Sequence, residues 1–179
     1  MKKLLLLSGN SIGNREWGDS CAEYFRPDFD LIFYPQYAHW TTGEKDINFE
    51  IELQKVKETV VGAGEKDEWF IFAKSIGSIL ALLSIQEGSI APKKCVFFGM
   101  PLKIFKAKKV ISDWSCLTEF AVPTLAFHNT EDAVADYSFT VKTVHELAPS
   151  IVLQTLPGKT HEYLDFALYA SHIKKFLSL

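Results

Sequence analysis

Residues 69–83 read WFIFAKSIGSILALL: an apolar run, a short polar turn and a second apolar run in immediate succession. The first run is short and rich in aromatic residues, which is typical of a strand buried on both faces. The second run is longer and apolar nearly all round, which is typical of a helix packed on a sheet. Ser75 lies at the junction, so this stretch predicts a strand that turns sharply into a helix at the serine.

Further apolar runs of strand length occur along the chain, each too continuous for a half-exposed strand and therefore expected to be buried on both faces. Helical patterns separate several of them. The expected strands are Lys3–Leu7, Leu31–Tyr34, Trp69–Phe72, Cys95–Phe98, Thr124–Phe127 and Ile151–Leu156. The expected helices are a stripe from Phe49 to Val60, then Ile76–Ile85, Tyr137–Leu147 and Glu162–Leu177. Strand–helix alternation implies right-handed crossovers and a parallel sheet. The sequence therefore predicts an α/β fold: a single domain over residues 1–179, a three-layer sandwich whose six-stranded parallel sheet carries helices on both faces.

Composition restricts the class of protein. The chain has 179 residues, 47% hydrophobic residues and a net charge of −3, which suits a globular domain and offers no basic face for nucleic acid or an anionic membrane. Cys21, Cys95 and Cys116 lie far apart and show no metal-binding spacing. The leader-like start MKKLLLL is too short for a signal peptide, and no run approaches the length of a membrane span. We expect a soluble cytoplasmic protein.

Two serines match the G-x-S-x-G pattern of a nucleophile elbow. GNSIG at residues 9–13 matches literally, whereas AKSIG at residues 73–77 has Ala73 in place of the first glycine. An elbow needs small residues two positions either side of a serine on a strand-to-helix turn. Ser75 has that setting, although it could also serve as a plain helix N-cap. Ser11 is followed by the polar stretch NREWGDS, where no buried helix is expected, so Ser75 is the candidate nucleophile.

Two later loops supply partners for Ser75. HNTEDAV follows the fifth expected strand and contains Asp132, while PGKTHEY follows the sixth and contains His161. Loops that follow parallel strands share the carboxyl edge of the sheet, where ligands bind in such folds. A histidine can take the serine proton, and a carboxylate can hold the imidazole in the required tautomer. The order Ser75, Asp132, His161 therefore predicts a catalytic triad.

With these pieces in register, almost the whole chain resembles the α/β-hydrolase superfamily, in particular its small, cap-less, esterase-like members. The resemblance rests on AKSIGS, VPTLAFHNTEDAV and LPGKTHEY. It departs from the family pattern at Ala73 and at Asn129, where the family often has glycine. The family spacing of acid and valine selects Asp132 with Val134 over the rival Glu131, and leaves Asp136 to cap the following helix.

The resemblance also implies an oxyanion hole and a pocket. It places the two backbone N–H donors at Asn10, in the loop after the first strand, and at Ile76, directly after the nucleophile. Ser11 then belongs to the loop that supplies the hole. The residues expected to line the pocket are Ser11, Tyr37, His39, Trp40 and Met100. His39 lies on a site-facing loop, whereas His128, His145 and His172 are expected to be packing or surface residues.

The expected function is that of a serine hydrolase, which cleaves a small carboxylic ester, thioester or related acyl substrate through an acyl-enzyme. Such chemistry needs neither metal nor organic cofactor. The segment from Pro101 to Val122 is too short for a large lid, so an open site is expected. Two alternatives remain: a flavodoxin-like protein with SGNSIGN around the phosphate of FMN, and a hydrolase fold used only as an interaction module. The sequence specifies neither the natural substrate nor the oligomeric state.

Overall fold

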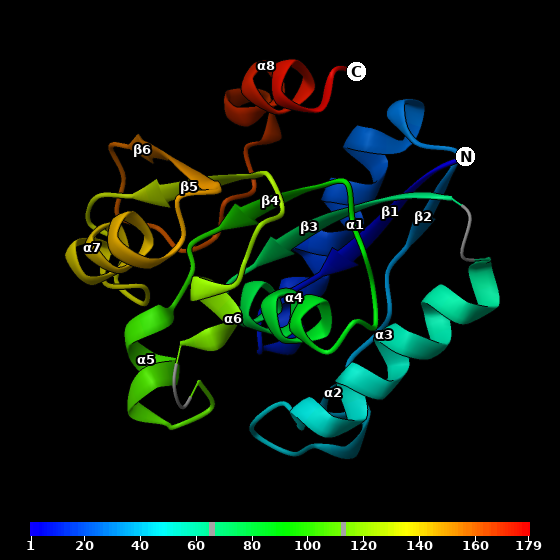
Figure 1. Ribbon diagram of the computed structural model, residues 1–179, viewed down its shortest axis with the longest axis horizontal. Helices are drawn as coiled ribbons and strands as arrows, with labels where there is room; N and C mark the ends of the chain where they lie inside the picture. Colours follow the sequence, from blue (N-terminus) through cyan, green and yellow to red (C-terminus); the bar gives the residue numbers. More distant parts are fainter. Residues whose placement is uncertain (65–66, 112–113) are drawn as a thin grey trace.

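A twisted parallel sheet forms the centre of the molecule (Figure 1). The computed structural model describes residues 1–64, 67–111 and 114–179. The strands, in the order β2-β1-β3-β4-β5-β6, are β1 (Lys2–Leu7), β2 (Leu31–Phe33), β3 (Glu68–Lys74), β4 (Lys94–Phe98), β5 (Thr124–Asn129) and β6 (Ile151–Leu156). Every neighbouring pair runs parallel. The α/β fold and the six-stranded parallel sheet are thus confirmed.

Helices cover both faces of the sheet. Successive side chains of a strand point to opposite faces, so a continuous apolar run places apolar side chains on both of them. Leu4 and Leu6 of β1 join an apolar cluster with α1 (Arg15–Phe25) and α8 (Phe166–Leu177). Leu5 and Leu7 join the opposite cluster. That second layer holds the remaining α-helices: α2 (His39–Thr42), α3 (Phe49–Ala63), α4 (Ile76–Gln86), α5 (Leu102–Ala107), α6 (Ser115–Thr118) and α7 (Tyr137–Leu147). Figure 1 shows α8 on one side of the sheet and α3 and α4 on the other.

The prediction that no buried helix follows GNSIG is wrong. A 3-10 turn, η1 (Ile12–Asn14), leads straight into α1. Trp17, Cys21 and Phe25 recur every four residues and form the buried stripe of this helix. Gly18 does not break the helix but allows a close contact, since a Cβ there would lie 2.0 Å from Cζ of Tyr34.

Two further expectations need correction. The edge strands are half-exposed rather than buried on both faces, as Leu31 in β2 and Val152 in β6 show with exposed fractions of 42% and 60%. Helix α8 begins at Phe166, not at Glu162, so His161 lies on a loop that precedes the helix. The predicted lid-less segment from Pro101 to Val122 holds only the short helices α5 and α6, and its residues 112 and 113 lie outside the described part.

The sheet order places a topological switch point between β1 and β3. From β1 the chain moves outward to β2, then returns to the other side of β1 to form β3 and the strands beyond it. Loops at such a point diverge to opposite sides and leave a crevice at the carboxyl ends of the strands. The loop that contains Asn10 and the turn that contains Ser75 flank this point. In the three described ranges, no helix has both the length and the apolar character needed to cross a bilayer.

Candidate active site

Ser75 forms by itself the turn between β3 and α4. Its backbone has φ 54° and ψ −125°, a conformation that is unfavourable for residues other than glycine. The turn is held from two sides: Ser75 N–H donates to Phe98 O at 2.8 Å, and Ser78 Oγ donates to Ser75 O at 2.6 Å. The expected sharp turn is therefore present at the predicted serine, and the surrounding backbone maintains its strain.

Close packing explains the small residue two positions after Ser75. A Cβ on Gly77 would lie 2.1 Å from Leu7 O and 2.7 Å from Ser8 O, both of which are backbone atoms. The end of β1 therefore passes directly against the first turn of α4. On the other side, Ala73 is fully buried in β3, in register with Leu7 and Phe97. The glycine thus brings the loop after β1 beside the serine turn.

The loop after β1 is fixed through Asn10. Its carbonyl oxygen accepts hydrogen bonds from His39 Nε2 and Trp40 Nε1, both at 2.7 Å. Its side chain donates to Lys45 O at 2.9 Å and accepts from Ile47 N–H at 3.0 Å. Within residues 1–64, 67–111 and 114–179, the backbone N–H of Asn10 has no acceptor, and neither does that of Ile76 in the first turn of α4.

The residues expected to line the pocket are mostly buried behind the loop after β1. Tyr37 and His39 are 1% and 4% exposed, and Tyr37 Oη donates to Ser8 O at 2.8 Å. Trp40 is partly buried behind the same loop, and Met100 is fully buried. Ser11 is exposed and caps η1, because its Oγ accepts from Gly13 N–H at 3.2 Å. The aromatic residues therefore support the Asn10 loop from inside instead of forming the wall of an open pocket.

Asp132 and His161 form a tight pair at the ends of β5 and β6. His161 Nδ1 lies 2.8 and 2.9 Å from the two carboxylate oxygens of Asp132. The same carboxylate accepts from the backbone N–H of Val134 and Ala135, at 2.9 and 2.8 Å. Burial raises the pKa of Asp132, but the His161 hydrogen bond and these backbone donors outweigh it and lower the pKa to about 2. The group is therefore an ionised acceptor at neutral pH.

The His161 ring lies against Gly99, the residue that follows β4 beside the serine turn. Donation from Nδ1 to the carboxylate leaves Nε2 as a bare acceptor, and Nε2 is buried without a hydrogen-bond partner among the described residues. A Cβ on Gly99 would lie 2.9 Å from His161 Cε1. Lys74 pairs with Phe98 in register, so Ser75 and Gly99 are the first residues beyond two adjacent strands. No Ser75–His161 hydrogen bond is formed in this structure, as is common in unliganded sites.

Three residues at this edge carry contacts that the motifs did not indicate. Tyr163 Oη donates to Asp132 Oδ2 at 2.8 Å and accepts from Asn129 N–H at 3.0 Å. Asn129 Nδ2 donates to Thr160 O at 2.8 Å, so this departure from the family pattern links the Asp132 and His161 loops. Lys74, directly before Ser75, is 1% exposed. Its one sequence signal is a charge at the end of an otherwise apolar strand.

The rival residues occupy other roles. Glu131 is exposed and pairs with Lys159 at 3.4 Å, while Asp136 caps α7 by accepting from Phe139 N–H, as predicted. His128 is buried, and burial lowers its pKa. As expected for packing and surface residues, His145 and His172 are exposed on helices.

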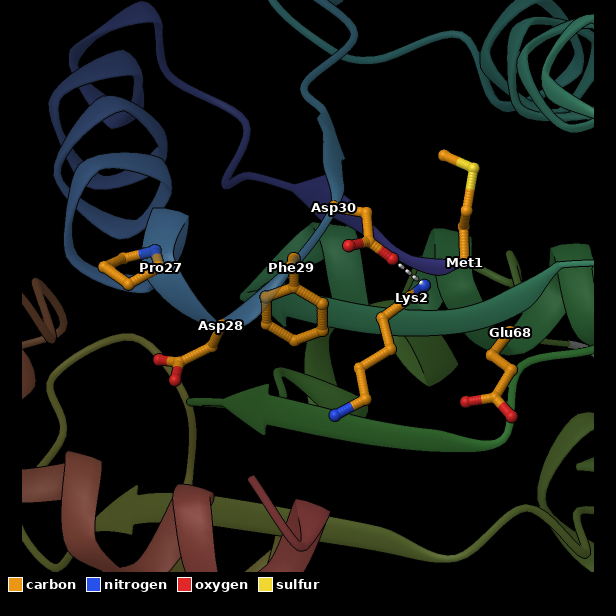
Figure 2. A pocket seen from close by; sticks show the side chains of 7 residues that line it. All are labelled: Met1, Lys2, Pro27, Asp28, Phe29, Asp30 and Glu68. Atoms are coloured by element: carbon orange, nitrogen blue, oxygen red, sulfur yellow. Dashed lines mark hydrogen bonds between the residues drawn. The ribbon is translucent and has the colours of Figure 1, made fainter.

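Two cavities differ in their relation to this site. One of about 370 Å³ contains Ile76 in its lining, which consists of Asp46, Ile47, Phe49, Ile76, Phe105, Lys108 and Val110. The other, of about 480 Å³, lies at the amino ends of β1, β2 and β3 and is lined by Met1, Lys2, Pro27, Asp28, Phe29, Asp30 and Glu68 (Figure 2). Of these two cavities, only the first adjoins the serine turn, through Ile76.

Comparisons with known proteins bear on the fold. No protein-family model and no curated protein matches the chain. Est1E from Butyrivibrio proteoclasticus, solved with ferulic acid bound, shares 14% identity at a TM-score of 0.77, over 99% of this chain and 88% of that one. A serine hydrolase without a lid from Xanthomonas campestris shares 15% identity at a TM-score of 0.71, over 97% and 81%.

A third similar structure is an α/β-hydrolase enzyme from a sediment metagenome of the Mar Chica lagoon. It shares 15% identity with a TM-score of 0.75, over 100% of this chain and 93% of that chain. At such identities the likeness concerns the backbone arrangement, which extends over at least 97% of this chain and over 81–93% of the three similar proteins. The chain therefore has the α/β-hydrolase fold, in a form similar to that of small serine hydrolases without a lid.

Proposed function

We propose that this protein is a serine hydrolase that cleaves small acyl substrates through a Ser75–His161–Asp132 triad. The observation that carries the proposal is the His161 ring. Its Nδ1 is hydrogen-bonded to an ionised, buried carboxylate, its Nε2 is buried with no hydrogen-bond partner among the described residues, and the ring lies against Gly99 beside the strained serine turn. A free, buried imidazole nitrogen next to a strained serine is the arrangement that a general base and its nucleophile need.

In the proposed reaction, His161 Nε2 takes the proton of Ser75 Oγ as Oγ attacks the substrate carbonyl carbon. The negative charge that develops on the carbonyl oxygen is received by the backbone N–H groups of Asn10 and Ile76. His161 then returns the proton to the leaving alcohol or thiol, and an acyl-Ser75 ester remains. A water molecule, deprotonated by His161, hydrolyses this ester. Asp132 stays ionised throughout and stabilises the imidazolium.

The acyl group of the substrate is proposed to occupy the cavity of about 370 Å³ beside Ile76. The proposed oxyanion donor and a side chain of the cavity wall belong to this same residue, so a carbonyl bound there directs its acyl group toward the cavity. Phe49 and Phe105 pack edge to face in the wall, and Lys108 and Asp46 lie 3.4 Å apart at its exposed side. An apolar wall with a charged rim suits a small uncharged acyl chain of an ester or thioester.

The FMN alternative receives less support from the loop after β1. A phosphate at this loop needs free backbone N–H groups. Here Gly13 N–H donates to Ser11 Oγ and Asn14 N–H donates to Ser11 O. The loop therefore satisfies these donors internally. The remaining alternative is a non-catalytic interaction module, and turnover of a short p-nitrophenyl ester would argue against it.

Active-site labelling tests the nucleophile. A fluorophosphonate should label Ser75 alone, as found by peptide mapping, because it reacts with a serine that has both a base and an oxyanion hole. Ser75→Ala should abolish labelling and hydrolysis of a short p-nitrophenyl ester, whereas Ser11→Ala should keep both. An adduct on Ser11 that survives Ser75→Ala would make the literal GNSIG match the nucleophile. Labelling of neither serine would favour the hypothesis of a non-catalytic interaction module.

Acyl-chain selectivity tests the cavity. Val110→Phe reduces its volume from a partly buried position, so kcat/KM should fall about tenfold for longer p-nitrophenyl esters and little for the acetate. Val152→Phe, at an exposed site on the edge strand β6, is the matched control and should leave the profile unchanged. An identical chain-length profile in Val110→Phe and wild type would place the acyl group elsewhere.

A further inference from the structure

Lys74 is a buried cation next to the proposed nucleophile. It is the last residue of β3, is 1% exposed, and precedes Ser75 directly. Because every second residue of a strand lies on the same face, Lys74 shares with Phe70 and Phe72 the sheet face that α1 and α8 cover. Its side chain therefore points toward the segments that lead into these helices. Burial lowers the pKa of Lys74, while Glu162 and Asp132 raise it. A buried ammonium is retained at a cost unless its hydrogen bonds are well placed.

One contact of Lys74 reaches the loop after β1. Its Nζ donates to Asn14 Oδ1 at 2.6 Å, and Asn14 Nδ2 donates to Ser11 O at 3.0 Å. Asn14 Oδ1 also lies 2.6 Å from the point where a Cβ on Gly9 would stand. The amide of Asn14 is thus pressed onto the backbone just before Asn10. Movement of Asn14 would let this backbone shift.

A second contact of Lys74 reaches the loop before α8. Its Nζ lies 3.5 Å from Glu162 Oε2, and Glu162 follows His161 in sequence. Glu162 N–H donates to Thr160 Oγ1 at 3.0 Å, so Glu162 is part of the same turn as the histidine. Because Glu162 is 68% exposed and the distance is long, this contact is the weaker of the two.

We infer that Lys74 is a positioning residue that ties the Asn10 loop, and more weakly the His161 loop, to the strand that carries Ser75. The inference rests on the proposed function insofar as it concerns catalysis. One side chain then fixes the distance between nucleophile, oxyanion donor and base, although it touches no reacting atom. Small misplacements of such groups have large effects on rate, up to about 10² for roughly 1 Å.

Kinetics test the catalytic part of the inference. Lys74→Met keeps the length of the side chain and removes the ammonium, so kcat should fall about 10- to 100-fold while KM changes less than about threefold. Asn14→Leu should reproduce the loss, and the double variant should be no slower than the slower single variant, because both act through one contact. Glu162→Gln should have an effect of about twofold or less.

A buried lysine at the opposite edge of the sheet supplies the matched control. Lys3 in β1 is also 1% exposed and pairs with Asp67 at 2.5 Å, near the amino ends of the strands. Lys3→Met should lower stability as Lys74→Met does and leave kcat unchanged. Equal losses of kcat in both variants would reduce Lys74 to a purely structural role and overturn the inference.

Amide hydrogen exchange separates this inference from the proposed function. In Lys74→Met, peptides that cover residues 8–14 should exchange at least about tenfold faster than in wild type, those that cover 158–163 should exchange moderately faster, and Lys3→Met should change neither. Unchanged exchange in both Lys74→Met and Asn14→Leu would overturn the inference whether or not the protein hydrolyses esters. If exchange is faster in Lys74→Met but Ser75 of the wild-type protein is not labelled, the positioning contact is kept and the hydrolase is rejected. Asn14→Leu, at a half-buried site, serves if Lys74→Met does not fold.

Discussion

At the scale of single residues, the Asp132 carboxylate determines what His161 can do. Oδ1 is occupied by the backbone N–H groups of Val134 and Ala135, and Oδ2 accepts from Tyr163 Oη, so the carboxylate cannot turn away from the ring. Only donation from Nδ1 satisfies this arrangement, and it leaves Nε2 free for a proton. The tautomer that the proposed triad needs is therefore enforced by the groups that surround the carboxylate.

Asp132→Asn should lower kcat by up to about 10⁴, the loss known for neutralising the carboxylate of a serine-protease triad. The amide would present a donor to His161 Nδ1–H or to Tyr163 Oη, and the imidazole would lose its preferred tautomer. Single-turnover acylation of Ser75 measures the effect. Glu131→Gln is the control: its exposed pair with Lys159 leaves kcat within about twofold. A severe loss in Glu131→Gln would move the acid by one residue.

The low pKa of Asp132 also makes the free energy of unfolding depend on pH. The pKa of an aspartate in an unfolded chain is about 3.9, whereas the folded-state pKa of Asp132 is about 2. Because the folded-state value is the lower one, the stabilisation is complete above the unfolded pKa and is lost as pH falls through that value toward the folded one. The urea midpoint of wild type should therefore fall more steeply below about pH 4 than that of Asp132→Asn. Parallel curves would show that the pair contributes no pH-dependent stability.

At the scale of elements, the contact between β1 and α4 joins the two halves of the site. Gly77→Ala forces a Cβ onto the backbone oxygens of Leu7 and Ser8, which have no rotamer by which to yield. We expect a stability loss of about 1–3 kcal/mol and at least about tenfold slower labelling of Ser75. Gly62→Ala in α3 is the control, since no atom of the described residues lies within 4 Å of its Cβ position. That change should stabilise the helix by up to about 1 kcal/mol. Wild-type stability and labelling rate in Gly77→Ala would contradict the close contact.

The elements also show which features of the fold and the candidate site could be predicted from the sequence. The four inner strands were identifiable because buried parallel strands are continuous apolar runs, and the half-exposed edge strands carry similar runs. The bounds of α7 and β6 were predicted correctly. Helix α1 was missed because Gly18 was interpreted as a helix breaker. In the structure this glycine makes room for Tyr34, 16 residues later in the chain. The Asp132–His161 pair was predicted from motif order. The roles of Tyr163, Asn129 and Lys74 were not, because each depends on a contact between loops after different strands. Spacing along one segment does not encode such contacts.

At the scale of the whole molecule, the two edges of the sheet carry different groups. The carboxyl edge holds the strained Ser75, the hydrogen-bonded Asn10 loop and His161, whose Nε2 has no partner within the described part of the chain. The amino edge holds the cavity of Figure 2, where Asp30 accepts from the backbone N–H of Lys2 at 2.7 Å, Glu68 pairs with Lys93 and Asp28 pairs with Lys174. These contacts stabilise strand ends, and none of the residues that line this cavity belongs to the serine turn. The smaller cavity beside Ile76 is therefore the better candidate for a substrate site.

This division predicts that changes at the amino edge affect stability without affecting the reaction. Asp30→Ala removes the acceptor for Lys2 N–H, at the point where β2 begins beside β1. We expect the free energy of unfolding to fall by about 0.5–1.5 kcal/mol, the value of an exposed hydrogen bond, with kcat/KM for a short ester unchanged. Urea unfolding and ester hydrolysis measure the two effects on the same preparation. A loss of kcat/KM in folded Asp30→Ala beyond about threefold, or protection of the Figure 2 cavity by substrate, would place function at the amino edge. Because parallel strands present only their carboxyl-end loops to the switch point between β1 and β3, we expect neither.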